Sequence, residues 1–390
     1  MVYLFWLSVS LIIYSYFIYP VLLIVFSALK QTICDIQHLL IKPQLPVNQM
    51  DLLPNVSIII AAYNESPCIE ARVRNLLALD YPIEKLAIHI GSDGSSDNTA
   101  EILNRFKEKN YHAHIFDVNR GKMSVLNDLI AQSQDEILIM SDANTHFNRD
   151  VVYKLVGHFN DEKVGAVCGE LHLVDAQSGD NKDSVYWRYE QILKFHESRL
   201  GALLGANGAI YAMRKALFKP LAANTIIDDF QIVMNVSKDK YKTIYDPEAI
   251  AIEEVAPDLR SEEARRVRIG LGNYQAFFDM GWALNPLLGW RFLAYLSHKV
   301  CRWFVPHLMI GAFISNCLLL NHVIYQLSLM GQVTFYLIAY YGIKRQKSDK
   351  KVSPLVGLIV FFVSMNIALF KGFIRYFNSN VQGTWERTTR

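Results

Sequence analysis

The chain has 390 residues, of which 52% are hydrophobic and 19% are charged, and its formal net charge is +2. This composition and a mean hydropathy of +0.14 exclude a disordered chain and a small secreted domain held together by disulfides. Because the charge is nearly balanced, the protein has no overall positive electrostatic field that would attract nucleic acid, and no nucleic-acid partner is expected. The five cysteines lie far apart without metal-ligand spacing, which indicates free thiols in a reducing compartment.

Three stretches of the sequence carry no Asp, Glu, Lys or Arg, namely residues 1–29, 303–343 and 352–370. A helix rises about 1.5 Å per residue, so roughly 20 apolar residues cross the core of a bilayer. Residues 1–30 are therefore predicted to be an N-terminal transmembrane anchor, because the apolar stretch is too long for a signal peptide and has no basic start. Residues 303–371 are predicted to form C-terminal membrane helices, with a break near Asn321 and His322.

The basic residues indicate which side of the membrane the soluble part occupies. Lys30 follows the first apolar stretch, and a basic cluster separates the other two: Lys344, Arg345, Lys347, Lys350 and Lys351. By the positive-inside rule both lie on the cytoplasmic side, so a cytosolic domain is expected in a multi-pass protein of the cell (inner or plasma) membrane. Two readings stay open for the basic tail, residues 372–390: either the third apolar stretch is re-entrant or interfacial, or the tail lies outside.

The soluble part alternates between strand-like and helix-like segments. After residues 31–54, which are typical of a linker, the β-branched run at residues 55–62 predicts a strand buried on both faces. Further strands are predicted at residues 86–91, 112–118, 136–141 and 164–174, and helices at residues 69–79, 98–109, 122–132, 149–159 and 184–200. This alternation indicates an α/β fold with a mostly parallel sheet and helices on both faces. Residues 281–302 have an amphipathic pattern, which predicts a helix in the membrane interface.

Polar side chains follow three of the predicted strands at the point where each strand ends. The segments are Ala62-Tyr63-Asn64-Glu65, Ser92-Asp93-Gly94-Ser95-Ser96-Asp97-Asn98 and Ser141-Asp142-Ala143-Asn144. Turn or helix-cap chemistry explains each segment alone. Ligands of parallel sheets, however, bind outside the carboxyl ends of the strands. Three such segments at one edge therefore indicate a ligand site.

Seven segments are similar, in order and rough spacing, to motifs of one known family. They are VSIIIAAYNE (56–65), SDGSSDNTAEIL (92–103), NRGKMSVLN (119–127), SDANTHF (141–147), GANGAIYAMRK (205–215), IIDDF (226–230) and ARRVRIGLGNYQ (264–275). Over residues 55–280 the chain thus resembles the membrane-anchored family 2 glycosyltransferases of bacterial polysaccharide and glycolipid biosynthesis. The resemblance implies a cytosolic GT-A domain, of the nucleotide-diphospho-sugar transferase type, and an inverting hexosyltransferase activity. It also implies a nucleotide-sugar donor, expected to be a UDP-sugar, a saccharide or lipid-linked acceptor, and partners among other polysaccharide-assembly proteins.

The resemblance places the donor at the strand ends. Tyr63, Glu65 and Asp93 would contact the base and ribose, since carboxylates accept hydrogen bonds from ribose hydroxyls and from a pyrimidine N–H. Lys122 would approach the diphosphate as a compact positive charge.

The segment from Ser141 to Asn144 stands where the family has an Asp-x-Asp metal motif. Side chains two residues apart on an extended segment point the same way, so Asp142 and Asn144 are expected to converge on one Mg²⁺ or Mn²⁺ ion, with Asp142 also part of the nucleotide-sugar site. Asn144 replaces the second aspartate of the family, and its neutral amide oxygen is the weaker ligand. Two alternatives stay open: Asn144 contacts the sugar or a metal-bound water, or Asn144 and Thr145 cap a helix.

The resemblance assigns the acid–base step to the acidic pair Asp228-Asp229. A carboxylate can take the proton of the acceptor hydroxyl as it attacks the anomeric carbon. The position in the motif gives this role to Asp229, with Asp228 holding the loop or favouring the helix N-terminus. A single base opposite a departing diphosphate implies inversion. Gly205, Asn207 and Gly208 would border the acceptor and donor sugar, because small residues let a substrate approach the backbone.

Arg265 and Arg268 share one face of a predicted helix, where the resemblance implies that they bind the diphosphate. The alternative that stays open is a cationic stripe against anionic lipid headgroups. Processive members of the family carry Gln-x-x-Arg-Trp here, and this chain lacks the Gln and the Trp. One or few additions are therefore expected, with a processive synthase of the hyaluronan, chitin or cellulose type as the alternative. A non-catalytic nucleotide-binding membrane scaffold is the alternative of another class, and the presence of Asp142, Asp229 and Arg268 argues against it.

Overall fold

The computed structural model describes residues 1–40, 53–174, 185–254, 259–348 and 350–378. The chain divides into two compact units. The first, the sheet unit, comprises Leu23–Asp258 and Pro286–Ala294. The second, the helical unit, comprises Met1–Leu22, Leu259–Asn285 and Tyr295–Asn380.

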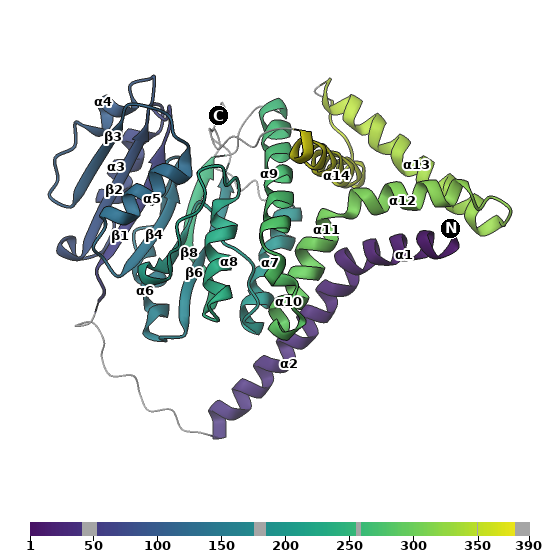
Figure 1. Cartoon of the computed structure of the whole chain (residues 1–390), viewed down its shortest axis with the longest axis horizontal. Helices are drawn as coiled ribbons and strands as arrows, with labels where there is room; N and C mark the ends of the chain where they lie inside the picture. The colour runs from purple at the N-terminus through teal and green to yellow at the C-terminus, as the bar shows by residue number, and fades with distance from the viewer. Residues whose placement is uncertain (41–52, 175–184, 255–258, 349, 379–390) are drawn as a thin grey trace. The chain divides into compact units, whose positions relative to one another are not determined.

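The sheet unit is built on an eight-stranded sheet with the order β3-β2-β1-β4-β7-β6-β8-β5 (Figure 1). Five strands confirm predicted ones: β1 (Val56–Ala62), β2 (Leu86–Asp93), β3 (Tyr111–Phe116), β4 (Ile137–Asp142) and β6 (Val164–Val174). Three others are not predicted by the sequence pattern: β5 (Thr145–Phe147), β7 (Tyr211–Arg214) and β8 (Lys242–Glu254). Strands β1 to β4 pair in parallel, as do β6 and β8, whereas β7 is antiparallel to β4 and β6, and β5 to β8. The α/β fold with a mostly parallel sheet is confirmed.

Five helices of the sheet unit lie where the sequence predicts them, and a sixth begins at the acidic pair: α3 (Ile69–Leu77), α4 (Thr99–Leu103), α5 (Lys122–Gln132), α6 (Val151–Gly157), α7 (Val185–Leu200) and α8 (Asp228–Lys238). Helix α4 ends at Leu103, well before the predicted end at residue 109. The chain turns back there toward β3, and the Tyr111 hydroxyl donates to Leu103 O at 3.2 Å. That bond satisfies one of the carbonyls that every helix end leaves without a partner.

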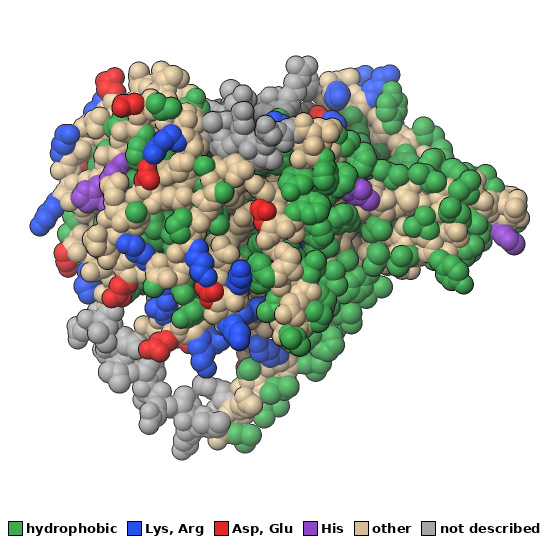
Figure 2. Space-filling model, viewed as in Figure 1, with side chains coloured by type: hydrophobic (Ala, Val, Ile, Leu, Met, Phe, Trp, Pro, Cys, Tyr) green, Lys and Arg blue, Asp and Glu red, His purple; other side chains and the backbone are tan. Residues whose placement is uncertain are grey.

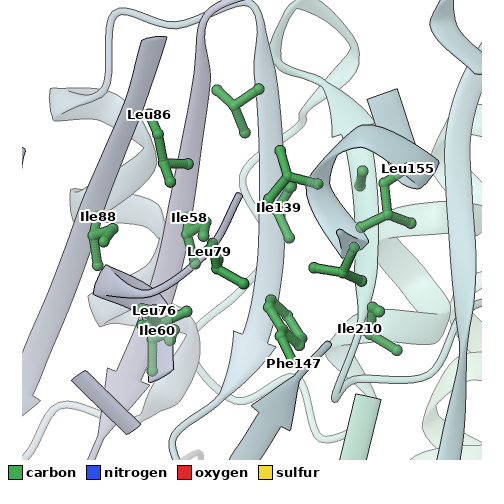
Figure 3. Packing of buried hydrophobic residues seen from close by; sticks show 14 of the residues in the cluster. Ile58, Ile60, Leu76, Leu79, Leu86, Ile88, Ile139, Phe147, Leu155 and Ile210 are labelled. Carbon is green, nitrogen blue, oxygen red and sulfur yellow. The ribbon is translucent and has the colours of Figure 1, made fainter. Parts of the chain in front are cut away.

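Apolar side chains fill both faces of the sheet. Successive residues of a strand point to opposite faces, so Ile58 and Ile60 of β1 belong to one buried cluster with Leu76 of α3. Ile59 and Ala61 belong to a second cluster, with residues of α5 and α8. Figure 3 shows part of the first cluster, where side chains of β1, β2, β4 and α3 meet. Burial on both faces explains why β1 is apolar without alternation and why its polar chemistry begins only at its end.

One continuous helical stretch opens the chain. It consists of α1 (Val2–Ile13), a π-helical turn (Tyr14–Ile18) and α2 (Tyr19–Leu40). Residues 31–40, expected in a linker, therefore continue α2, and residues 41–52 of that linker lie outside the described residues.

Among the described residues, three helices are long and apolar enough to cross a membrane: Val2–Gln37, α13 (Val323–Gln346) and α14 (Pro354–Asn378). Helix α12 (Val305–Cys317) is shorter, and the chain breaks between it and α13, as predicted. Hydrophobic side chains cover much of the visible surface of these apolar helices (Figure 2). Instead of one amphipathic helix, residues 281–302 form short segments: Gly281–Leu284, Pro286–Leu288, α10 (Trp290–Ala294), Tyr295–Val300 and the start of α11 (Cys301–Trp303).

Within the helical unit, α9 (Leu259–Asp279) packs directly on α14. A Cβ atom on Gly372 would lie 2.6 Å from the carbonyl carbon of Gly270, and one on Gly270 would lie 3.1 Å from Ala368 O. The two glycines therefore let the two backbones touch, as small residues do where helices cross closely. The predicted end of the soluble domain at residue 280 stays a prediction, and the contacts group α9 with the apolar helices.

Candidate active site

The carboxyl ends of three parallel strands meet at one edge of the sheet. Strands β2, β1 and β4 are neighbours, with Ala62 paired to Ser92 and Ala61 paired to Asp142. The polar segments that follow these strands are therefore adjacent in space, as the sequence predicts.

The loops after β1 and β2 are tied to each other through Asn64. This residue adopts a left-handed conformation with φ of 56°. Its N–H donates to Ser95 Oγ at 3.1 Å, and its Oδ1 accepts from the Ser96 N–H at 2.8 Å. These bonds fix the segment that carries Tyr63 and Glu65, for which nucleotide contact stays a prediction.

Asp93 is buried at the end of β2 and holds the turn that opens α5. Its Oδ1 accepts from the Arg120 N–H at 2.8 Å and its Oδ2 from the Gly121 N–H at 2.9 Å. Gly121 has φ of 89°, a conformation that glycine adopts without strain. Asp93 thus places the next residue, Lys122, and its predicted contact with the nucleotide is not tested by this geometry.

Lys122 joins carboxylates from two distant elements. Its Nζ lies 2.9 Å from Asp142 Oδ1 at the end of β4 and 3.3 Å from Asp228 Oδ2 at the start of α8. Burial acts to lower the pKa of Lys122, but Asp142, Asp228 and Asp229 outweigh it and hold that pKa above its usual value. The ammonium therefore stays protonated, and it compensates carboxylates that would otherwise repel one another.

Asp229 and Asp142 face the same small loop. A Cβ atom on Gly208 would lie 3.2 Å from Asp229 Oδ2 and 3.6 Å from Asp142 Oδ2. The Phe230 N–H donates to the other oxygen of Asp229 at 2.8 Å. Burial, followed by repulsion from Asp228, raises the pKa of Asp229 above its ordinary value. This carboxyl is therefore a better proton acceptor than an exposed aspartate.

The other two residues expected beside the sugars hold this loop in place. Gly205 has φ of 75°, and a Cβ there would lie 2.6 Å from Cδ2 of Phe230, so the loop is pressed against the first turn of α8. Asn207 is buried; its Nδ2 donates to Gly169 O at 2.9 Å, and its Oδ1 accepts from Lys194 Nζ. The amide of Asn207 is thus engaged within the protein, and its contact with a sugar stays a prediction.

The assignment of Asp142 and Asn144 to a metal stays a prediction. Ala143 and Asn144 form a turn between β4 and β5, so the argument from an extended segment does not reach Asn144. The helix-cap alternative is wrong, because Thr145 begins a strand. Among the described residues no group of three or more His, Cys, Asp or Glu is placed to hold a metal. The carboxylates of Asp142 and Asp229 lie around the space that a Cβ atom on Gly208 would fill. Mg²⁺ commonly combines one or two carboxylate oxygens with phosphate oxygens of the substrate. Asp142 thus fits a divalent ion shared with a diphosphate.

Arg265 and Arg268 lie on α9, which belongs to the helical unit. The carboxylates belong to the sheet unit, so the assignment of these two arginines to the diphosphate stays a prediction.

One residue of this region is not predicted by the motifs. Arg72 of α3 is fully buried; it donates to Ser141 Oγ at 2.6 Å and to Asn75 Oδ1 at 2.9 Å, and its guanidinium lies 4.2 Å from the ring centre of Phe147. Burial lowers the pKa of Arg72 to about 9, while the charge of Asp142 acts to raise it. Ser141 Oγ in turn donates to Ala209 O at 2.7 Å. The sequence alone could have indicated Arg72, because it places this charged residue on the apolar helix face formed by residues 69, 73 and 76.

Comparison with solved structures identifies the fold. The chain is similar to a mannosyltransferase from Pyrobaculum calidifontis, solved in complex with GDP-Man and Mn²⁺, with a TM-score of 0.67 and 20% sequence identity. The match covers 96% of this chain and 99% of that one. The sheet unit therefore has the GT-A fold of glycosyltransferases.

Sequence comparison then matches one segment of the chain to a family. Residues 57–219 match the model of glycosyl transferase family 2. The poly-beta-1,6-N-acetyl-D-glucosamine synthase of Staphylococcus epidermidis is 27% identical over 280 residues, which is 66% of this chain and 66% of that protein. The synthase of Staphylococcus aureus (strain COL) is 29% identical over 247 residues, 60% of this chain and 57% of that protein. The match thus spans less than two thirds of the length of these relatives. Residues 57–219 thus form a glycosyl transferase family 2 domain.

Proposed function

We propose that this enzyme transfers a sugar from a UDP-sugar to a saccharide or lipid-linked acceptor at the cytosolic face of the membrane, with inversion, in polysaccharide synthesis. The observation that carries the proposal is the convergence of Asp142 and Asp229 over Gly208, at the strand edge where α/β sheets bind ligands. Two relatives named for a polymer of N-acetylglucosamine make UDP-N-acetylglucosamine the first donor to test.

Each residue of the cluster has a step that suits its charge and position. Asp229 takes the proton of the acceptor hydroxyl, since its pKa is raised by burial and by Asp228. Lys122 binds the leaving diphosphate as a fixed positive charge. A divalent ion, which Asp142 would hold, supplies further stabilisation of that diphosphate when it is bound.

Two observations point to different product lengths. The missing Gln and Trp beside Arg268 favour one or few additions. The likeness to poly-beta-1,6-N-acetyl-D-glucosamine synthases favours a polymer, so processive synthesis is the second candidate. Both share the same donor site and differ only in how the acceptor is retained.

The test uses the full-length protein in detergent with labelled UDP-N-acetylglucosamine, UDP-glucose and GDP-mannose, each with Mg²⁺, with Mn²⁺ and with EDTA. We expect incorporation from a UDP-sugar that EDTA abolishes and either ion restores. Product length then separates the two candidates. No incorporation from any donor, with UDP binding retained, would leave the membrane scaffold as the better assignment.

A further inference from the structure

A pocket of about 570 Å³ in the sheet unit is lined mainly by basic side chains. Six cations line it: Lys30, Lys163, Arg199, Lys240, Lys242 and Arg291. No acidic residue is among the residues that line it. Lys and Arg side chains gather on this part of the surface, at the lower centre of Figure 2.

The pocket lies at the edge of the sheet opposite to the candidate active site. Lys163 precedes β6 and Lys242 begins β8, and the Lys242 N–H donates to Lys163 O at 2.7 Å. Strand β6 is antiparallel to β7, which is antiparallel to β4, so β6 runs in the direction of β4. The amino end of β6 therefore lies at the edge away from Asp142, which ends β4. This pocket is distinct from the donor site.

Within the part of the chain that the structure describes, few charges of the pocket are paired with carboxylates. Of the six cations, Lys242 has a carboxylate partner among the described residues, Asp161 at 2.9 Å. Lys30 Nζ donates to Arg199 O at 2.7 Å, which is a neutral acceptor. Clustered like charges repel one another, and a bound anion removes that repulsion through charge-assisted hydrogen bonds.

Arg291 forms the fixed wall of the pocket. Its guanidinium donates to Ser237 O at 2.7 Å, to Tyr241 O at 2.9 Å and to Gly201 O at 3.3 Å, so it is held by backbone carbonyls alone. The rotamer is thus set before any ligand arrives, which lowers the entropic cost of binding. Lys163 and Lys240 are exposed and lie around this wall, where they can reach a ligand.

The position of Lys30 indicates where the ligand comes from. Residues 1–29 carry no charge and, as a helix, extend about 43 Å, which exceeds the roughly 30 Å of a bilayer core. Lys30 therefore lies at or beyond the level of the lipid headgroups if this stretch spans the membrane. We propose that the pocket binds a phosphate-bearing anion, either the headgroup of an anionic lipid or a soluble phosphate.

The test compares two double variants of the full-length protein in neutral detergent. Lys163→Glu/Lys240→Glu reverses two charges of the pocket, and Lys107→Glu/Lys109→Glu makes the same change on exposed residues between α4 and β3. The melting temperature Tm is followed during titration with dioctanoyl-phosphatidylglycerol, with dioctanoyl-phosphatidylcholine as a zwitterionic comparison, and in a separate arm with inorganic phosphate. A ligand that binds the folded state raises Tm.

We expect phosphatidylglycerol to raise the Tm of the wild type and of Lys107→Glu/Lys109→Glu alike. In Lys163→Glu/Lys240→Glu the midpoint of the titration should rise by about tenfold or more, since each basic residue near an anionic surface contributes measurably. A pocket-dependent response to phosphate alone also supports the proposal and assigns a soluble ligand. Equal responses of the two double variants, or no response of the wild type to either ligand, would overturn it. Lys163→Gln/Lys240→Gln, which removes the charges without reversing them, serves if the Glu variant does not fold.

Discussion

The two halves of the sheet contribute to the active site in different ways. In the half formed by β3, β2, β1 and β4, all strands are parallel, and three neighbouring strand ends bring Tyr63, Asp93 and Asp142 to one edge. In the half formed by β7, β6, β8 and β5, pairings are mixed; Gly208 comes from the loop before β7, and Asp229 comes from the first turn of α8. Parallel topology alone thus places the first set, whereas the second depends on packing between residues far apart in the chain.

The largest expected effect concerns proton transfer, which we assign to Asp229 in the half of the sheet with mixed pairing. Asp229→Asn should lower the transfer rate by about 10³-fold, because an amide cannot accept the acceptor proton, while UDP-sugar binding changes little. Rate and donor affinity are measured on the same preparation. Asp239→Asn is the control, since Asp239 lies at the other end of α8 and pairs with Lys219. Unchanged turnover in Asp229→Asn would remove this residue from the mechanism.

Arg72 tests whether the parallel half depends on its buried cation. Arg72→Met should lower the free energy of unfolding by about 2 kcal/mol, because the hydrogen bonds to Ser141 and Asn75 are lost at a fully buried site. Arg74→Met on the same helix should cost much less, since the Arg74 side chain is 68% exposed. Thermal unfolding compares the two, and equal losses would show that Arg72 has no special role.

The next prediction concerns Gly208, where a carboxylate from each half of the sheet approaches the same residue. Gly208→Ala should lower the rate by about tenfold with little change in Tm, because its Cβ would lie 3.2 Å from Asp229 Oδ2 and would displace that carboxylate. Gly157→Ala is the matched control, since a Cβ at Gly157 has no neighbour within 4 Å. A Gly208→Ala enzyme with the wild-type rate would contradict a role for the close approach of Asp229 and Asp142 to Gly208.

The smallest effect concerns acid stability of the parallel half. Burial, followed by His112 and His114, lowers the pKa of His89 to about 4. The folded protein therefore binds fewer protons than the unfolded chain, and this contribution to stability is complete above pH 6.5 and is lost as the pH falls toward 4. Between pH 7.5 and 5 the loss should be of order 1 kcal/mol. His89→Asn should flatten the dependence of Tm on pH, and an unchanged slope would exclude His89 as its source.

The parts of the fold that the sequence predicts are those with a local signal. Strand β1 is a continuous β-branched run, and α5 matches its predicted bounds because its apolar spacing is clear. Strand β8 is not predicted from the sequence, because it contains Asp246-Pro247-Glu248 and a proline within a run argues against a strand. Strands β5 and β7 are short segments whose pairing is set by distant partners.

The same limit applies to the site. Motifs identify Asp142, Asp228 and Asp229 as acidic positions, but only the fold brings Lys122 between two of them. The argument for Asn144 assumed an extended backbone, and the turn at Ala143 removes that assumption. Sequence patterns thus predict which residue types serve the chemistry, whereas nonlocal packing decides which atoms converge.

The glycine contact between α9 and α14 has a mechanical consequence. Because the backbones touch at Gly270 and Gly372, neither helix can slide or roll past the other without a clash. Helix α9 carries Arg265 and Arg268, and α14 is apolar and long enough to cross a bilayer. Any tilt of α14, for example in a thicker or thinner bilayer, would therefore be transmitted to these arginines as a rigid displacement.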